Sequence, residues 1–223
     1  MNYRINEKMK RVSVKIYDNS KYLKSIVLPT AYYPTNSNND FEVFGTNNTE
    51  VLNNEVLLSI IDEIEYKVGY CYTNTEKVIE LALKNGIHLT PYCGWLFIDN
   101  NDFPIHHSWC MHGNSLIDLS DDFNISKSDK VVQKFLSLKT KEERWNYIAD
   151  VHIKSMSLKN TERCKPIGKT HPSLLYIGCP CSPSDGRKIY RNLLKMYPNH
   201  EAERNTNKNG MTDMQRIIYN KLR

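Results

Sequence analysis

The chain lacks any run of the roughly 20 apolar residues that a membrane-spanning helix requires. Residues 1–8 contain no apolar stretch typical of a signal peptide, and no internal repeat is present along the chain. We therefore expect an intracellular, cytoplasmic protein without a membrane segment. Its 223 residues are 40% hydrophobic and 25% charged, which is typical of a globular protein of one or two domains.

The sequence also lacks any recognisable nucleic-acid-binding motif, although both of its ends are basic. The net charge is +5, and Lys and Arg outnumber Asp and Glu within residues 1–25 and 187–223. Basic ends can bind nucleic acid or an acidic partner, but such charges most often form solvated surface. Nucleic-acid binding is therefore an alternative and not the main hypothesis.

The six cysteines are not expected to form disulfides, because a cysteine in a reducing compartment is by default a buried apolar residue or a free thiol. Four residues of the C-terminal part, Cys164, His171, Cys179 and Cys181, could supply ligands to a zinc ion. Their spacing matches no common zinc motif, and Cys-Pro-Cys is an awkward chelate. We therefore expect no metal and no cofactor, and we interpret residues 177–183 as a packed loop.

Hydrophobic patterning predicts an α+β fold. Apolar alternation within residues 11–28 predicts strands or an extended arm, and polar residues 34–49 predict a loop. Further strands are expected at residues 92–98, 105–111 and 116–119. Helices are expected at residues 51–66, 73–85, 128–138, 141–156, 183–196 and from 212 to 222.

These elements predict a helix that carries a nucleophile, packed on a small antiparallel sheet, with a helical C-terminal half. The expected division is residues 1–124, a core with an N-terminal arm, and residues 125–223, a helical region of the same or a second domain. Two helix starts are well marked, because Thr140 and Glu143 form a capping-box pattern and Ser182 precedes a proline.

Cys71, His107 and Asp118 occur in the order and local context that a thiol nucleophile, its base and the orienting acid require. Cys71 lies just before Thr73-Asn-Thr-Glu76, a capping-box pattern at the start of an amphipathic helix. A helix N-terminus favours negative charge, and the thiolate is the nucleophilic form of cysteine. The backbone N–H of Cys71 could also donate to a developing oxyanion.

The sequence further predicts that His107 and Asp118 meet. If Gly113-Asn114 forms a two-residue hairpin turn, Trp109 faces Asp118 across the two strands. His107 then lies on the same face as a diagonal neighbour of Asp118, roughly 7–8 Å away at the backbone. His106 has the opposite parity and points away, whereas a loop longer by one residue would exchange the two histidines.

These residues also carry a family resemblance. Gly-Tyr-Cys71-Tyr-x-Asn, an aliphatic helix, Pro-Ile-x-His107-Ser-Trp109 and Leu-Ile-Asp118 resemble the papain/transglutaminase-like superfamily of Cys-His-Asp enzymes. The likeness covers about residues 66–120 and is strongest to uncharacterised phage and bacterial proteins with the same core pattern. It implies a cysteine that starts a helix on an antiparallel sheet, with the histidine and the acid on successive strands. Members include peptidases, amidases, deamidases, transglutaminases and acyltransferases.

The chain departs from papain-like peptidases before the cysteine. Those enzymes place a glutamine there as an oxyanion donor, whereas residues 63–67 contain none. Tyr70 and Asn74 are therefore candidate oxyanion donors in addition to the Cys71 backbone. Trp95 and Trp109 are candidate walls of the cleft, with core packing as the alternative for each.

The sequence thus predicts a cysteine-dependent acyl-transfer enzyme, either a thiol protease-like hydrolase or a transferase, that acts on an amide of a peptide or protein. Cys71 would attack the carbonyl carbon, His107 would act as base and then as acid, and Asp118 would orient His107. Two alternatives stay open. One is a non-catalytic protein-binding factor of phage or mobile-element type on the same scaffold, and the other is a nucleic-acid-binding module that uses the basic ends.

Overall fold

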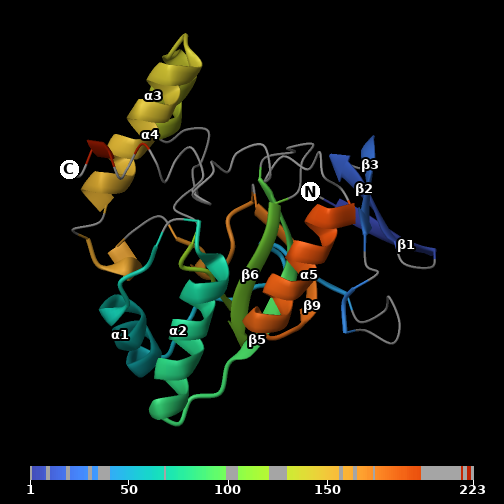
Figure 1. Ribbon diagram of the computed structural model, residues 1–223, viewed down its shortest axis with the longest axis horizontal. Coiled ribbons are helices and arrows are strands. Elements are labelled where there is room, and N and C mark those ends of the chain that lie inside the picture. The colour runs from blue at the N-terminus through green and yellow to red at the C-terminus, as the bar shows by residue number, and fades with distance from the viewer. Residues whose placement is uncertain are drawn as a thin grey trace.

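A six-stranded antiparallel sheet lies at the centre of the protein, as the computed structural model in Figure 1 shows. Its strands run in the order β4 (Glu42–Phe44), β9 (Leu174–Pro180), β5 (Thr90–Ile98), β6 (Ile105–His112), β7 (Ser115–Ile117) and β8 (Ile167–Gly168). The structure describes residues 2–8, 11–18, 21–29, 32–34, 41–67, 69–98, 105–120, 130–155, 158–162, 165–172, 174–196, 217 and 220–221.

A second sheet contains three antiparallel strands in sequence order, β1 (Asn2–Lys8), β2 (Arg11–Asp18) and β3 (Lys21–Pro29). The strands expected within residues 11–28 are therefore confirmed, whereas the sequence did not predict β1. Near the end of β3, Leu28 is buried in the same apolar cluster as Trp95 of the central sheet.

The helices of the described residues complete an α+β fold, as predicted. They are α1 (Glu55–Glu63), α2 (Cys71–Lys84), α3 (Lys130–Ser137), α4 (Lys141–Ser155), the short 3₁₀-helix η2 (Asn160–Glu162) and α5 (Pro183–Met196). None of these helices is both long and apolar enough to cross a membrane. The helix expected at residues 212–222 and the boundary expected near residue 124 lie largely outside the described residues.

Two of the predicted helix starts are confirmed by their hydrogen bonds. The Thr140 N–H donates to Glu143 Oε2 at 2.9 Å, and the Glu143 N–H donates to Thr140 Oγ1 at 3.1 Å, so the capping box of α4 is present. At the start of α5, the Asp185 N–H donates to Ser182 Oγ at 3.1 Å. Local sequence therefore sets both of these helix boundaries.

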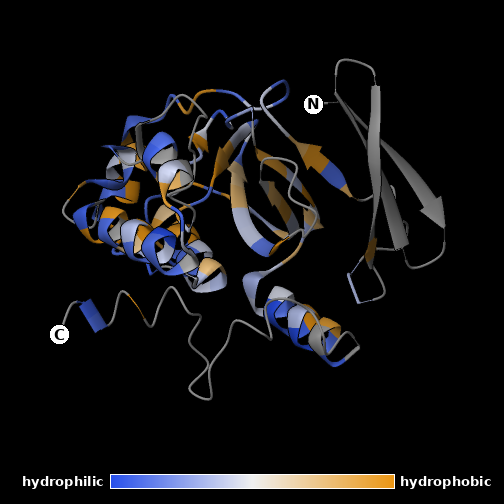
Figure 2. Ribbon diagram, turned by 90° about the horizontal axis from the view of Figure 1, so that it is seen from above, coloured by the Kyte–Doolittle hydropathy of each residue, from blue (hydrophilic) through white to orange (hydrophobic). Residues whose placement is uncertain are grey.

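The two faces of the central sheet are covered by different apolar clusters. On one face, α5 packs its buried residues against Cys93 and Trp95 of β5, while α1 and α2 pack against Cys110 of β6. The opposite face buries a cluster that includes Trp109 and Tyr176. Figure 2 shows apolar colour along the strands of this sheet, whereas the helices carry polar residues outward. Since side chains alternate along a strand, neighbouring residues of β6 face different clusters.

The loop expected at residues 177–183 is wrong for its first half, because residues up to Pro180 belong to β9. β9 is paired on both sides, by β4 and β5, and its residues 174–179 are buried. A strand covered on both faces is a continuous apolar run without alternation, here Leu174-Leu-Tyr-Ile177. Gly178 fits this strand because a Cβ there would lie 2.5 Å from the carbonyl oxygen of Cys93. The C-terminal half therefore contains two strands, β8 and β9, in addition to its helices.

Candidate active site

Cys71 is the first residue of α2, with Tyr70 at the N-cap position. The expected cap at Thr73 is wrong, and the helix begins two residues earlier. The physical reason is a distant arginine, since Arg187 Nη2 of α5 donates to Thr73 Oγ1 at 3.2 Å and the same guanidinium forms a two-pronged ion pair with Glu76. Both side chains of the predicted capping box are thus engaged with α5.

Cys71 therefore lies at the N-terminus of α2, which has no side-chain cap. Tyr70 makes no capping hydrogen bond with its side chain, and the Cys71 thiol is half-buried and outside any disulfide. The N–H groups of a first helical turn have no partner within the helix, so they stabilise a nearby negative charge. The far end of α2 is also set locally, because Gly86 at a φ of 73° ends the helix in a Schellman motif.

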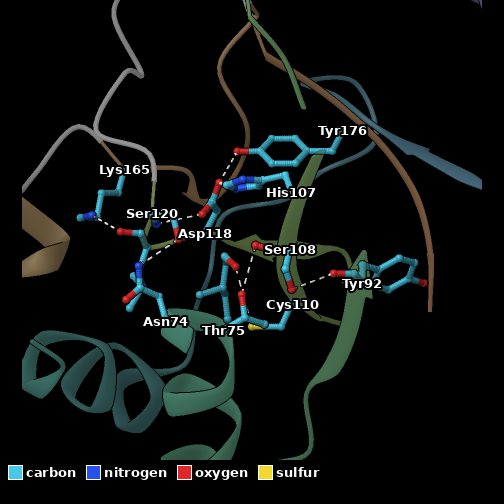
Figure 3. A network of polar contacts seen from close by, with 12 residues as sticks. Asn74, Thr75, Tyr92, His107, Ser108, Cys110, Asp118, Ser120, Lys165 and Tyr176 are labelled. Atoms are coloured by element: carbon cyan, nitrogen blue, oxygen red, sulfur yellow. Dashed lines mark hydrogen bonds and ion pairs between the residues drawn. The ribbon is translucent and has the colours of Figure 1, made fainter. Parts of the chain in front are cut away.

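His107 and Asp118 meet as the hairpin geometry predicts. His112 pairs with Ser115 across the turn, so the two-residue loop is confirmed. His107 Nε2 lies 2.6 Å from Asp118 Oδ2, and both side chains are buried. Figure 3 shows the imidazole and the carboxylate pointing toward one another on the sheet.

The electrostatics of this pair favour an imidazolium beside a carboxylate. Burial, the largest single influence, lowers the pKa of His107, but the Asp118 charge and the Cys71 side chain together raise it well above its usual range. Burial likewise raises the pKa of Asp118, yet the charge and hydrogen bond of His107 hold it below its ordinary value. Each member of the pair therefore stabilises the charged form of the other.

Cys71 completes the contact chain, because its side chain lies close enough to His107 to raise the pKa of the imidazole. Nε2 of His107 is engaged with Asp118, so Nδ1 is the ring nitrogen that remains available to the thiol. β7 pairs with β6 only from Cys110 to His112, so this edge of β6 is without a strand partner at His107 among the described residues. The start of α2 reaches the imidazole past that open edge.

Asp118 has two further donors that orient its carboxylate. The Ser120 N–H donates to Oδ1 at 2.9 Å, and the Tyr176 hydroxyl donates to Oδ2 at 2.9 Å (Figure 3). Tyr176 lies on β9 and is fully buried. With His107, three donors therefore surround one buried carboxylate, which is how a desolvated charge is stabilised in a protein interior.

Asn74, a candidate oxyanion donor, makes hydrogen bonds within the protein in this geometry. Its Nδ2 donates to the Lys67 carbonyl at 2.8 Å and to Ser120 Oγ at 3.1 Å, so both amide hydrogens are used. Its Oδ1 accepts from the Lys67 N–H at 2.9 Å. Asn74 thereby links the chain before the nucleophile to the chain after Asp118. Nearby, Lys165 Nζ donates to the Leu119 carbonyl and lies 3.2 Å above the centre of the Tyr66 ring.

The remaining aromatic candidates divide between surface and core. Tyr70 is 45% exposed beside Cys71, so its position allows contact with a bound substrate. Trp95 is buried at 2% exposure and Trp109 at 0%, which agrees with the packing alternative for both. Trp109 stacks on Tyr92 at 5.8 Å between ring centres. Neither indole lines an open cleft.

His106 points to the opposite face of the sheet, as predicted from its parity. Its Nε2 lies 2.5 Å from the Tyr33 hydroxyl, and its Nδ1 lies 2.5 Å from the Tyr72 hydroxyl. The ring also stacks on Tyr190 of α5, with 5.4 Å between centres. His106 thus ties the residue after Cys71 to β6 and contributes to packing.

The other thiols have surroundings that suit core residues. Burial raises the pKa of Cys110, and a hydrogen bond with Cys181 together with burial raises the pKa of Cys93. Cys179 and Cys181 are buried in the apolar cluster under α5. Cys164 lies outside the described residues, and within those residues no group of histidines, cysteines and carboxylates could hold a metal ion.

Sequence reasoning missed Tyr176 and the other support of Asp118. Tyr176 belongs to the apolar run Leu174-Leu-Tyr-Ile177, whose composition is that of a buried strand. That signal could have placed the tyrosine in the sheet, but no sequence pattern gives its partner 58 residues away.

No protein-family model, curated protein or solved structure matches this chain.

Proposed function

We propose that the protein is a cysteine-dependent acyl-transfer enzyme that acts on an amide of a peptide or protein. The observation that carries this proposal is the contact chain from the half-buried Cys71 thiol through His107 to Asp118, with the imidazolium electrostatically favoured. The order of the three residues along the chain supports membership of the papain/transglutaminase-like superfamily, which we propose on the same grounds.

The proposed reaction has two stages. The Cys71 sulfur forms a bond to the carbonyl carbon, and the carbonyl electron pair moves to the oxygen, which faces the first-turn N–H groups of α2. Collapse of this intermediate breaks the C–N bond while the His107 proton passes to the leaving amine. Water then gives a proton to His107, attacks the thioester, and releases the acid and the Cys71 thiolate. An amine in place of water would complete a transfer.

The experiment that tests this proposal is alkylation of Cys71 by iodoacetamide, followed by peptide mass spectrometry at pH 6.5 and at pH 10. We expect His107→Ala to slow the reaction at pH 6.5 by about tenfold or more, because the imidazolium that stabilises the thiolate is lost. At pH 10 the thiolate forms without help, so the rates should agree. His88→Ala is the matched control, since His88 is exposed on the chain after α2.

The comparison is made between variants and not between cysteines, because Cys93 and Cys110 are buried and would react slowly for that reason alone. Equal rates for the wild type and His107→Ala at pH 6.5 would exclude the thiolate–imidazolium pair. A non-catalytic binding protein on the same scaffold would then be the better account of the chain.

A further inference from the structure

Tyr176 is a buried polar group with a direct connection to the proposed site. Its hydroxyl donates to Asp118 Oδ2 at 2.9 Å, and the same oxygen lies 2.6 Å from His107 Nε2. The tyrosine is 0% exposed, so water does not substitute for this hydrogen bond. One carboxylate oxygen therefore receives two donors, the phenol and the imidazole.

The surroundings of Tyr176 fix the position of its ring. The Trp109 ring packs edge-on against it with 5.2 Å between centres, and the His107 ring lies 6.1 Å away. Its strand, β9, is hydrogen-bonded on both sides within the sheet. A phenol held by packing on both sides gives a hydroxyl with a defined direction, which a surface tyrosine would not have.

The second carboxylate oxygen is held separately by the Ser120 N–H at 2.9 Å. With Oδ1 bound to the backbone and Oδ2 bound to Tyr176, rotation of the Asp118 carboxylate is prevented in both directions. The orientation of the carboxylate sets that of the imidazole, because His107 Nε2–H points at Oδ2.

We propose that Tyr176 is a positioning residue of the reaction, which acts through Asp118 to keep the His107 imidazolium directed at Cys71. The inference rests on the proposed function. It assigns a role in the site to β9, because Tyr176 lies on this strand, 105 positions after Cys71 in the chain. Against the effect of burial, the hydrogen bond from Tyr176 also helps to hold the pKa of Asp118 below its ordinary value, after the larger effects of His107 and of the Ser120 N–H.

The test is the alkylation rate of Cys71 in Tyr176→Phe at pH 6.5 and at pH 10. We expect a decrease of about three- to tenfold at pH 6.5, the range for loss of one buried hydrogen bond, and an unchanged rate at pH 10. Tyr92→Phe is the matched control, because Tyr92 on β5 also donates to a carboxylate, Glu42 Oε1 at 2.8 Å, and also packs on Trp109. It should leave both rates unchanged.

A double-mutant cycle separates positioning from packing. If Tyr176 acts through Asp118, Tyr176→Phe should change the rate by less than about twofold in an Asp118→Asn background. Equal losses in both backgrounds, or equal losses at both pH values, would overturn the positioning role. Melting temperatures of all variants show whether each protein is folded at the temperature of the assay.

The two proposals fail in different ways. A slow His107→Ala variant together with a wild-type rate in Tyr176→Phe at pH 6.5 would overturn the role of Tyr176 and leave the proposed function standing. A wild-type rate in His107→Ala would overturn both, because no imidazolium would then act on Cys71.

Discussion

Asp118 is a buried carboxylate whose energetics depend on its neighbours. An isolated ionised carboxylate in a protein interior is strongly unfavourable, and it usually takes up a proton instead. Here His107, Ser120 and Tyr176 provide a charge and three hydrogen bonds, so the pKa of Asp118 stays low despite burial. Removal of one partner therefore lowers the free energy of unfolding by more than the ion pair contributes to it, because a buried charge is left without compensation.

We predict that Asp118→Asn lowers the free energy of unfolding by about 3 kcal/mol near pH 6, because it leaves the buried imidazolium without its counter-charge. Because the pKa of His107 is raised in the folded protein, the imidazolium contributes fully to the free energy of unfolding below pH 6.5, the ordinary pKa of the unfolded chain. This contribution is lost as the pH rises through the higher pKa of the folded state. The lowered pKa of Asp118 means that its contribution is lost as the pH falls below 3.8.

The stability difference between wild type and Asp118→Asn should thus be largest between about pH 4 and pH 6.5 and should shrink on the alkaline side. Urea unfolding at pH 5.5, 8 and 10 measures it. Asp150→Asn is the control, because the ion pair of Asp150 with Lys221 is half-exposed and contributes little. A difference that stays constant from pH 5.5 to pH 10 would contradict the assignment of an ion pair.

The start of α2 is fixed by contacts from two other elements, β6 and α5. The Tyr72 hydroxyl meets His106, the Thr75 hydroxyl donates to the Ser108 carbonyl at 3.1 Å, and Arg187 of α5 pairs with Glu76. These contacts lie within the first two turns of the helix and directly follow Cys71 in the chain. The placement of Cys71 is therefore a property of packed elements more than of a local cap.

Gly186 allows the close approach of α5 to this region. A Cβ at Gly186 would lie 2.3 Å from Cys93 Sγ and 2.9 Å from the Tyr72 ring. We predict that Gly186→Ala lowers the free energy of unfolding by about 1–2 kcal/mol, because the cost of overpacking exceeds the gain in helix propensity. Denaturant unfolding measures this loss.

The same variant should also make Cys93 reactive in the folded protein, since α5 must move away from β5 to admit the methyl group. Native-state alkylation of Cys93 tests this second expectation. Arg191→Ala, on an exposed position of α5, is the control and should leave both quantities near the wild-type values. Wild-type stability and an unreactive Cys93 in Gly186→Ala would show that α5 does not pack there.

Local signals account for the elements that the sequence predicted correctly. The two-residue turn at Gly113 set the parity of β6 and β7, and with it the meeting of His107 and Asp118. The capping box at Thr140 depends only on residues within one helical turn. In both cases the partners are a few residues apart, so the pattern contains the interaction.

The incorrect predictions depend on partners far apart in sequence. The capping-box residues Thr73 and Glu76 bind Arg187, more than 110 positions away, so α2 starts before them. Burial of β9 on both of its faces, by two different apolar clusters, removes the alternation that identifies a half-exposed strand. The catalytic role of Cys71, His107 and Asp118 and the superfamily resemblance stay predictions, which the alkylation experiments address.

The order of strands ties distant parts of the chain into one sheet. β9 pairs with β5 and β8 pairs with β7, so these two late strands lie on either side of the run β5, β6 and β7 that holds His107 and leads into Asp118. The same segment supplies Tyr176 to the carboxylate, and α5 follows it directly. The core expected at residues 1–124 therefore lacks two strands of its own sheet.

We predict that a chain of residues 1–124 does not fold cooperatively. Loss of β9 would leave both β4 and β5 with unpaired edges, and loss of α5 would expose the apolar cluster around Cys93 and Trp95 to water. Thermal unfolding followed by circular dichroism should show no sharp transition for this fragment. Addition of a separate fragment of residues 125–223 should restore one, together with alkylation of Cys71 at pH 6.5 at the wild-type rate. A sharp transition in residues 1–124 alone would instead mean that the first half holds a complete core, and that β9 extends a sheet already stable without it.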